Sequence, residues 1–179
     1  MSNPWPGGMM RWLSGLLFIP VAMAVPAAAQ TPDTLKDLLR FQECPLSSQI
    51  TAVYARPAFA DPARQFTRIS PKGKPEGYVR CSLRDRSVYC EASAVRGRSL
   101  SDRTPLPTDA VAALLRLGFQ PQQGGADLMY RRVLTGSPDF DAVATLMLTT
   151  LHDAYGAREE LGIETVAPFA GQIVTACVR

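Results

Sequence analysis

The amino-acid sequence predicts an α+β domain in which a mostly antiparallel sheet is covered by helices that lie largely on one face. Two observations lead to this class. Stretches with apolar residues at helical spacing stand near the start, in the middle and in the last third of the chain, and alternating stretches stand between them. Short, turn-rich connections separate the alternating stretches, as expected for antiparallel neighbours.

The first helix is predicted to be short. Pro32 suits its first turn, and Leu35, Leu38 and Leu39 fall on one side. The helix is expected to end near residue 42, because the residue before Pro45 is disfavoured in a helix. The following residues, 46–61, fit a helical face or a short strand, and the sequence leaves this choice open.

Three strands are expected in the first half of the sheet. Residues 65–69 alternate weakly, and residues 71–77 form a turn-rich loop. Residues 78–93 predict a hairpin with a four-residue loop at residues 84–87. In this register Leu83 faces Val88, Cys81 faces Cys90 and Val79 faces Ala92, all on one side. The opposite side carries Arg80, Ser82, Tyr89 and Glu91.

The second half of the chain continues the α+β pattern. A helix capped by Thr108 is expected to stop at Gly118, and a second hairpin over residues 119–134 turns at Gly124-Gly125. The clearest helix opens at Ser137-Pro138-Asp139 and stops at Gly156. Its apolar side is formed by Phe140, Val143, Ala144, Met147, Leu148, Leu151 and Tyr155. Two short apolar pieces, residues 163–166 and 173–178, make up the tail.

The first 29 residues are predicted to be a cleaved export signal. A stretch with one basic side chain and no acid precedes an apolar run over residues 12–24, and Ala27 and Ala29 suit a signal peptidase. The alternative is an uncleaved membrane anchor, but the run is 13 residues long and a spanning helix needs about 20. We therefore expect cleavage between Ala29 and Gln30, and a single periplasmic or secreted domain over residues 30–179 without stable membrane insertion.

All four cysteines follow the expected cleavage point. An even number in an exported chain favours two disulfides. The hairpin register favours Cys81–Cys90, which leaves Cys44–Cys177 to tie the two ends together. The alternative, in which each hairpin cysteine bonds to a cysteine near one end of the chain, stays open.

The sequence predicts no catalytic residue, no metal site and no cofactor. His152 is the only histidine, so a Cys–His or Ser–His pair would need it. Its position near the end of a helix suits an exposed side chain in the favourable field of the helix dipole. The chain has no GxSxG, HExxH or CxxC motif and no glycine-rich phosphate loop. We therefore favour a protein that is not an enzyme, with a small hydrolase that uses His152 as an alternative.

The polar side of the predicted hairpin is a candidate binding surface. Tyr89 lies there with Arg80 and Arg84, and such residues are enriched at protein interfaces. An ordinary exposed sheet face would have the same composition. Without its signal the chain carries 18 basic and 16 acidic residues, and this near-neutral balance argues against a nucleic-acid partner.

Three segments carry a resemblance to a known fold. They are Leu114–Phe119 (LLRLGF), Met129–Arg132 (MYRR) and Leu146–Gly156 (LMLTTLHDAYG). Together they resemble the type III secretion chaperone-like fold, and more closely the bacterial YbjN and TY-Chap groups. In those groups a helix ends in a Leu-Gly-aromatic turn, a strand pair follows, and the last helix ends in a TLRDVYG-like sequence. The resemblance spans roughly residues 108–156.

The resemblance implies a small α+β domain that binds a protein or peptide, often as a homodimer, without catalytic residues. Secretion chaperones work in the cytosol, whereas this chain begins with a predicted export signal, so the fold transfers more directly than the function. We predict an exported, non-enzymatic binding or chaperone-like module of the cell envelope. A disulfide-stabilised structural component of the envelope is a further alternative.

Overall fold

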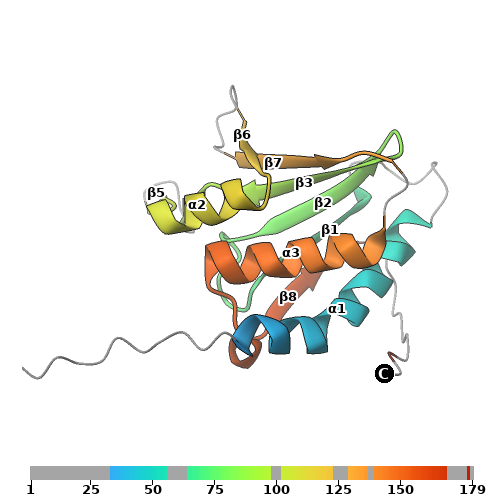
Figure 1. Ribbon diagram of the computed structural model, residues 1–179, viewed down its shortest axis with the longest axis horizontal. Coiled ribbons are helices and arrows are strands. Elements are labelled where there is room, and N and C mark those ends of the chain that lie inside the picture. The colour runs from blue at the N-terminus through green and yellow to red at the C-terminus, as the bar shows by residue number, and fades with distance from the viewer. Residues whose placement is uncertain are drawn as a thin grey trace, which may run out of the picture. The chain divides into compact units, whose positions relative to one another are not determined.

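In the computed structural model, three helices lie on one face of a six-stranded antiparallel sheet (Figure 1). The structure describes residues 33–55, 64–97, 102–122, 129–136, 139–168 and 177. The helices are α1 (Asp33–Tyr54), α2 (Thr108–Arg116) and α3 (Phe140–Tyr155). This architecture confirms the predicted α+β class.

The sheet strands follow the order β6-β7-β3-β2-β1-β8. Their bounds are β1 (Phe66–Pro71), β2 (Val79–Arg84), β3 (Ser87–Ser93), β6 (Gln120–Pro121), β7 (Met129–Leu134) and β8 (Ile163–Val166). A separate two-stranded pair joins β4 (Val95–Arg96) to β5 (Thr104–Pro105), and a short 3-10 turn, η2 (Glu159–Leu161), precedes β8. Every strand pairing is antiparallel.

Helix α1 is longer than the sequence predicted, because it continues through Pro45 to Tyr54. A proline inside a helix costs about 3 kcal/mol or more. The apolar face continues beyond it, since Leu46, Ile50 and Val53 are fully buried. Each such side chain contributes about 1.5–3 kcal/mol when it leaves water, so their burial outweighs the proline. Figure 1 shows α1 changing direction along its length, as helices do at proline.

The hairpin formed by β2 and β3 has the predicted register. Cys81 lies opposite Cys90, and the flanking pairs are Val79 with Ala92 and Leu83 with Val88. The turn is tighter than predicted, because Arg84 pairs with Ser87 and only Asp85 and Arg86 form the loop. Both residues have positive φ angles, 48° and 62°, as a two-residue hairpin turn of type I′ requires.

The ends of α2 and α3 differ in how they are capped. Pro107, with extended backbone, is the N-cap of α2, and no side chain caps that helix. Thr108 is therefore its first helical residue and not the predicted cap. At α3 the Asp139 carboxylate accepts hydrogen bonds from the backbone of the first turn, and Gly156 ends the helix at a φ of 69°. Residues 123–128, 137, 138 and 173–176, on which other predicted features fall, lie outside the described residues.

The core lies between α3 and the sheet. Met147, Leu148 and Leu151 of α3 are fully buried, and so are Cys81 and Cys90 on the helix-bearing side of the hairpin. The two cysteines are joined by a disulfide with a Cα–Cα distance of 4.1 Å. Helix α3 contacts α1 on one side and α2 on the other, so it is the element on which the helical layer assembles.

A second disulfide ties the C-terminal segment to α1. It joins Cys44 to Cys177 across a sequence separation of 133 residues, with a Cα–Cα distance of 6.0 Å. The structure thus contains the first of the two pairings that the sequence left open. The two bridges act at different ranges, because one links neighbouring strands and the other closes nearly the whole described chain into a loop.

Candidate functional site

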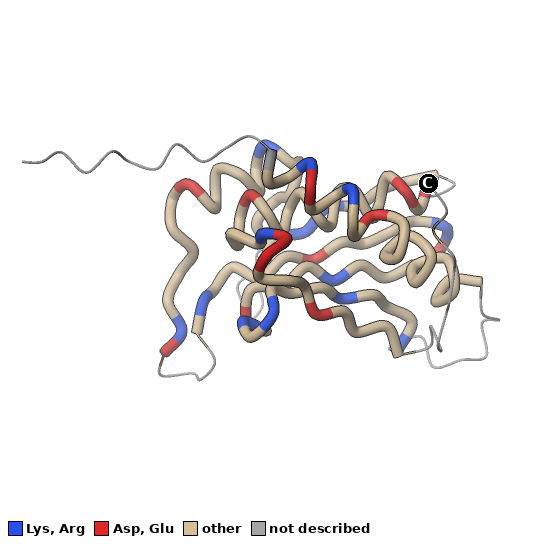
Figure 2. The backbone as a smooth tube through the Cα atoms, turned by 90° about the horizontal axis from the view of Figure 1, so that it is seen from below, with Lys and Arg blue, Asp and Glu red and all other residues tan. Residues whose placement is uncertain are grey.

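The face of the sheet that the helices leave open carries the candidate site. Figure 2 shows the helices above the strands, with basic positions along several strands. Because strand side chains alternate, Arg80 points away from the helices while its neighbours point toward them. Tyr89 and Arg84 lie on this same side. The structure therefore groups the three residues that the sequence suggested for a binding surface.

A row of directly opposite residues crosses the open face from edge to edge. Successive members are register partners on neighbouring strands, so their side chains share one side of the sheet. The row runs Val166, Arg68, Arg80, Glu91, Arg131 and Gln120. We call its four central members, Arg68, Arg80, Glu91 and Arg131, the arginine row.

The arginine row places two like charges side by side. Arg68 and Arg80 are directly opposite each other on β1 and β2, an arrangement that destabilises a sheet. Glu91 follows on β3, and its carboxylate accepts a hydrogen bond from Arg131 at 2.7 Å. That pair is partly shielded, with side chains 18% and 35% exposed. The row therefore concentrates positive charge toward β1 and β2.

Aromatic rings hold three arginines of the open face in place. The guanidinium-to-centroid distances are 4.2 Å for Arg68 over Tyr78, 4.1 Å for Arg80 over Phe66 and 6.0 Å for Arg84 over Tyr89. Each exposed stack contributes about 0.5–1 kcal/mol, which is comparable to the penalty for a like-charged cross-strand pair. A stacked guanidinium presents its flat side to the ring, and its N–H edge is the part that binds carboxylates.

Apolar side chains border the arginine row on both sides. On one side, Phe66, Tyr89 and Val133 belong to the next cross-strand row, and Val133 is 43% exposed. On the other side, the Tyr78 hydroxyl donates to the sulfur of Met129 at 3.5 Å. The open face thus combines guanidinium groups for carboxylates with rings and aliphatic groups for apolar side chains.

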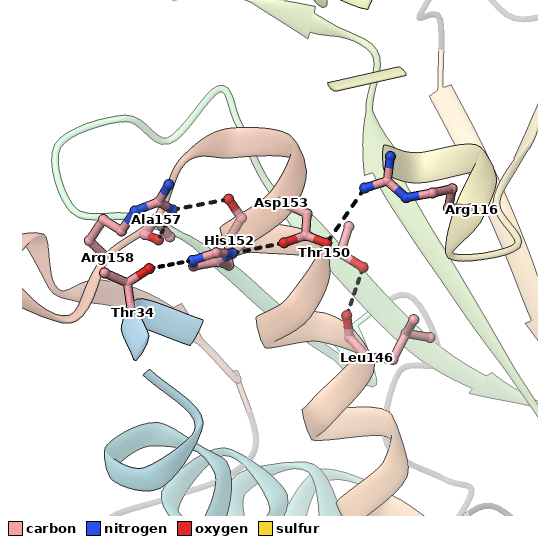
Figure 3. Close-up of polar contacts among 8 residues, drawn as sticks. All are labelled: Thr34, Arg116, Leu146, Thr150, His152, Asp153, Ala157 and Arg158. Atoms are coloured by element: carbon pink, nitrogen blue, oxygen red, sulfur yellow. Dashed lines mark hydrogen bonds and ion pairs between the residues drawn. The ribbon is translucent and has the colours of Figure 1, made fainter. Parts of the chain in front are cut away.

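His152 is not the exposed helix-end residue that the sequence predicted, because its side chain is only 15% exposed. The first turn of α1 lies against the end of α3, and Thr34 Oγ1 shares a 2.9 Å hydrogen bond with His152 Nε2 (Figure 3). Nδ1 lies 2.8 Å from Asp153 Oδ1. The other carboxylate oxygen of Asp153 lies 4.0 Å from Arg116 of α2.

A hydroxyl, an imidazole and a carboxylate in series have the residue types of a catalytic triad. Two pockets lined by described residues lie away from these three groups. One of about 290 Å³ is lined by Glu43, Cys44, Ser47, Ser48 and Asp141. Another of about 410 Å³ is lined by Pro71, Lys74, Glu76, Gly77, Arg96, Tyr155 and Gly156. We assign the contacts around His152 to the docking of α1 and α2 on the end of α3.

Other residues of the TLHDAYG segment make contacts within α3 or attach it to the sheet. Thr150 is buried and donates to the carbonyl of Leu146 within α3. The Tyr155 hydroxyl donates to the carbonyl of Ser93 on β3 at 2.5 Å. The last of the three segments that carry the family resemblance is therefore a junction at which α3 meets α1, α2 and the sheet, and it lies on the helix-bearing side, away from the open face.

Among the described residues, no cluster of three or more His, Cys, Asp and Glu side chains is placed to hold a metal ion. In that same part of the chain, no helix combines the length and the apolar character needed to cross a membrane.

Residues 57–161 match the family model TY-Chap3, described as T3SS (YopN, CesT) and YbjN peptide-binding chaperone 3. The match covers more than half of the chain, so the protein belongs to this family of peptide-binding chaperones. It confirms the predicted resemblance and extends it toward the N-terminus, to include β1, β2 and β3. No curated protein and no solved structure matches the chain.

Sequence reasoning missed half of the open face. Phe66 and Arg68 on β1 and Arg131 on β7 belong to the site, but their neighbours are fixed only by the strand order β7-β3-β2-β1. One signal was present, since two residues at alternate positions of a predicted strand must share a side. The sequence does not show which side of such a strand faces the helices or which strands lie next to it. Both are decided by pairing between segments that are distant in the sequence.

Proposed function

We propose that this chain is an exported chaperone-like module of the cell envelope that holds peptide segments of partner proteins on the open face of its sheet. Its family is described as peptide-binding. The observation that supports this site is the one-sided cover of the sheet, which leaves arginines and aromatic rings on the other face. Arginine and aromatic residues supply much of the binding energy in protein interfaces.

The open face is suited to holding a segment without changing it chemically. Ring and guanidinium contacts form with many different side chains, and each is worth about 0.5–1 kcal/mol at an exposed site. Several such contacts together give moderate affinity and broad selectivity, as a chaperone-like protein needs. The open face therefore favours binding over catalysis.

Peptide binding can be tested with an open-face variant and a matched control. We expect Tyr89→Ser to weaken binding to an array of unfolded envelope-protein peptides by about tenfold, because one anchor is worth about 1–2 kcal/mol. Phe41→Ser is the control, since Phe41 is a 49% exposed aromatic residue on α1 and its loss should change affinity little. Equal loss in both variants, or no binding by the unaltered protein, would count against the proposed site.

Export rests on the N-terminal pattern and is supported by the two disulfides, which persist in oxidising compartments. We expect the protein in the envelope fraction to begin at Gln30 when its N-terminus is sequenced. A cytoplasmic protein that retains Met1 and free thiols would refute the proposed location. An intact protein in the membrane fraction would instead support the anchor alternative.

The homodimer implied by the family resemblance stays a prediction. Light scattering on residues 30–179 would decide it, because a dimer has twice the mass of the single chain. The outcome does not alter the proposed binding face, which every copy would carry.

A further inference from the structure

We infer that the open face selects acidic segments, through the arginine row together with Arg84. This inference rests on the proposed function and adds to it the chemistry of the partner. The family description names a peptide but no charge. The selectivity follows from how the charges of the open face are already arranged in the free protein.

The acidic groups of the described open face have partners within the protein. Glu91 is bound by Arg131 at 2.7 Å. Glu164, on the edge strand β8, accepts a hydrogen bond from the backbone of Gly73 at 3.1 Å. The guanidinium groups of Arg68 and Arg84 lie over rings instead. A partner therefore meets a face whose carboxylates are engaged and whose positive charge exceeds its negative charge.

The excess positive charge is concentrated where Arg68 and Arg80 lie opposite each other, and a carboxylate of the partner is expected to bind there. Arg68 and Arg80 repel each other across β1 and β2 in the free protein. A carboxylate placed beside Arg68 interacts favourably with its guanidinium and offsets the repulsion between the two like charges. The resulting gain belongs to the complex alone, so the pair favours an acidic partner over a neutral one of the same shape.

The ring stacks reduce the side-chain conformational entropy that the arginines lose on binding. An unsupported arginine side chain gives up much of its rotamer freedom when it forms an ion pair. Arg68, stacked on Tyr78 at 4.2 Å, also donates a hydrogen bond to the carbonyl of Pro75. Its guanidinium is thus held in position before a partner arrives, and such preorganisation strengthens binding.

A peptide fits these observations better than a nucleic acid. Glu91 lies between Arg80 and Arg131 in the row, so the positive charges do not form the unbroken series that suits a continuous chain of phosphates. Exposed Val133 and the ring of Phe66 border the row, and they suit the apolar side chains that stand between acidic ones in a polypeptide. We therefore commit to an acidic peptide segment with interspersed apolar residues.

The experiment uses three labelled peptides of equal length and aromatic content that carry Glu, Gln or Lys at the same positions. Their affinities for the disulfide-bonded protein, residues 30–179, are measured by fluorescence anisotropy. We expect the Glu peptide to bind on the order of tenfold more tightly than the Gln peptide. Raising the salt from about 0.05 to 0.3 M should narrow this difference, because exposed charges are screened.

Two variants test whether Arg68 and Arg84 produce the preference for the Glu peptide. A third variant controls for the loss of one positive charge. Arg68→Gln and Arg84→Gln should each weaken binding of the Glu peptide by about three- to tenfold, and binding of the Gln peptide by less than about twofold. Arg40→Gln is the matched control, because Arg40 also lies over a ring, that of Phe41 on α1 at 5.4 Å. It removes the same charge and a similar stack from the helix-bearing side and should leave both affinities unchanged. Circular dichroism verifies folding, and Arg84→Gln, at the exposed hairpin end, remains informative if Arg68→Gln fails to fold.

Each outcome separates the inference from the proposed function. Equal binding of all three peptides would overturn the acidic preference and leave peptide binding intact. A preference for the Lys peptide, or an equal effect of Arg40→Gln, would also overturn it. Tighter binding to an oligonucleotide than to the Glu peptide would show that the face takes a different polyanion. If no peptide binds, the proposed function itself fails.

Discussion

Two tyrosines on the helix-bearing side of the sheet have buried hydroxyl groups, which stay neutral in the folded protein. Tyr155 donates its proton to the carbonyl of Ser93, and Tyr54 packs against Phe140 with ring centroids 5.3 Å apart. Burial raises the pKa of both well above the ordinary value of 10. The unfolded chain, by contrast, releases these protons at the ordinary pKa. Folding is therefore coupled to the protonation of both residues.

This coupling predicts a loss of stability in alkali. Above about pH 10 the unfolded state binds fewer protons than the folded state, so the free energy of unfolding falls as pH rises, by about 1.4 kcal/mol per pH unit for each tyrosine. Below pH 10 the contribution is fully present. Urea unfolding between about pH 9 and 11 measures the slope, and Tyr155→Phe should remove one tyrosine's share. An unchanged slope in that variant would contradict the assignment.

At the scale of elements, the hairpin between β2 and β3 shows where local sequence and fold disagree. Asp85 and Arg86 adopt positive φ angles, although side-chain-bearing residues lose about 1–2 kcal/mol in the left-handed region. The strain persists because the strands on either side place Cys81 opposite Cys90 and bury both. Pro45 inside α1 is tolerated for the same kind of reason, since the buried face continues past it.

The strained turn predicts a stabilising substitution. Arg86→Gly should raise the free energy of unfolding by about 0.5–1 kcal/mol, since glycine adopts positive φ without steric cost but gains freedom in the unfolded chain. Arg86→Ala is the control, because it removes the same side chain and keeps the strain. Chemical denaturation of both variants checks this, and a similar gain in both would point to the side chain instead of the backbone.

At the scale of the whole molecule, the Cys44–Cys177 bridge joins α1 to the C-terminal segment. Neither cysteine lies within the residues matched to the family, 57–161. The bridge therefore links the two flanking parts of the chain to each other. In the chain-entropy view, closing a loop of this length contributes about 5 kcal/mol by restricting the unfolded state.

Removing this bridge should lower stability without changing the fold. We expect Cys44→Ser with Cys177→Ser to lose about 2–5 kcal/mol in the free energy of unfolding, with an unaltered far-ultraviolet circular dichroism spectrum. Unfolding curves with and without reductant give the comparison. Cys81→Ala with Cys90→Ala offers a contrast, because it also removes buried atoms from the core. An undiminished stability in the serine variant would mean that the long-range bridge contributes little.

The sequence by itself determined the features that depend on neighbours along the chain. These are the α+β class, the hairpin register that brings Cys81 to Cys90, the stop of α3 at Gly156 and the family resemblance of its last helix. Each follows from periodicity or turn chemistry within a few residues. It also suggested the central part of the candidate site, through Tyr89, Arg80 and Arg84 on a single side of one hairpin.

Only the tertiary structure decided which distant segments become neighbours. It continued α1 through Pro45 and brought the partly buried His152 against Thr34. It also set Arg68 of β1 opposite Arg80, while Arg131 of β7 reached Glu91. The physical reason is that burial and strand pairing act between residues far apart in the chain, and their energies exceed local preferences. The arginine row exists only because four strands lie side by side in one order.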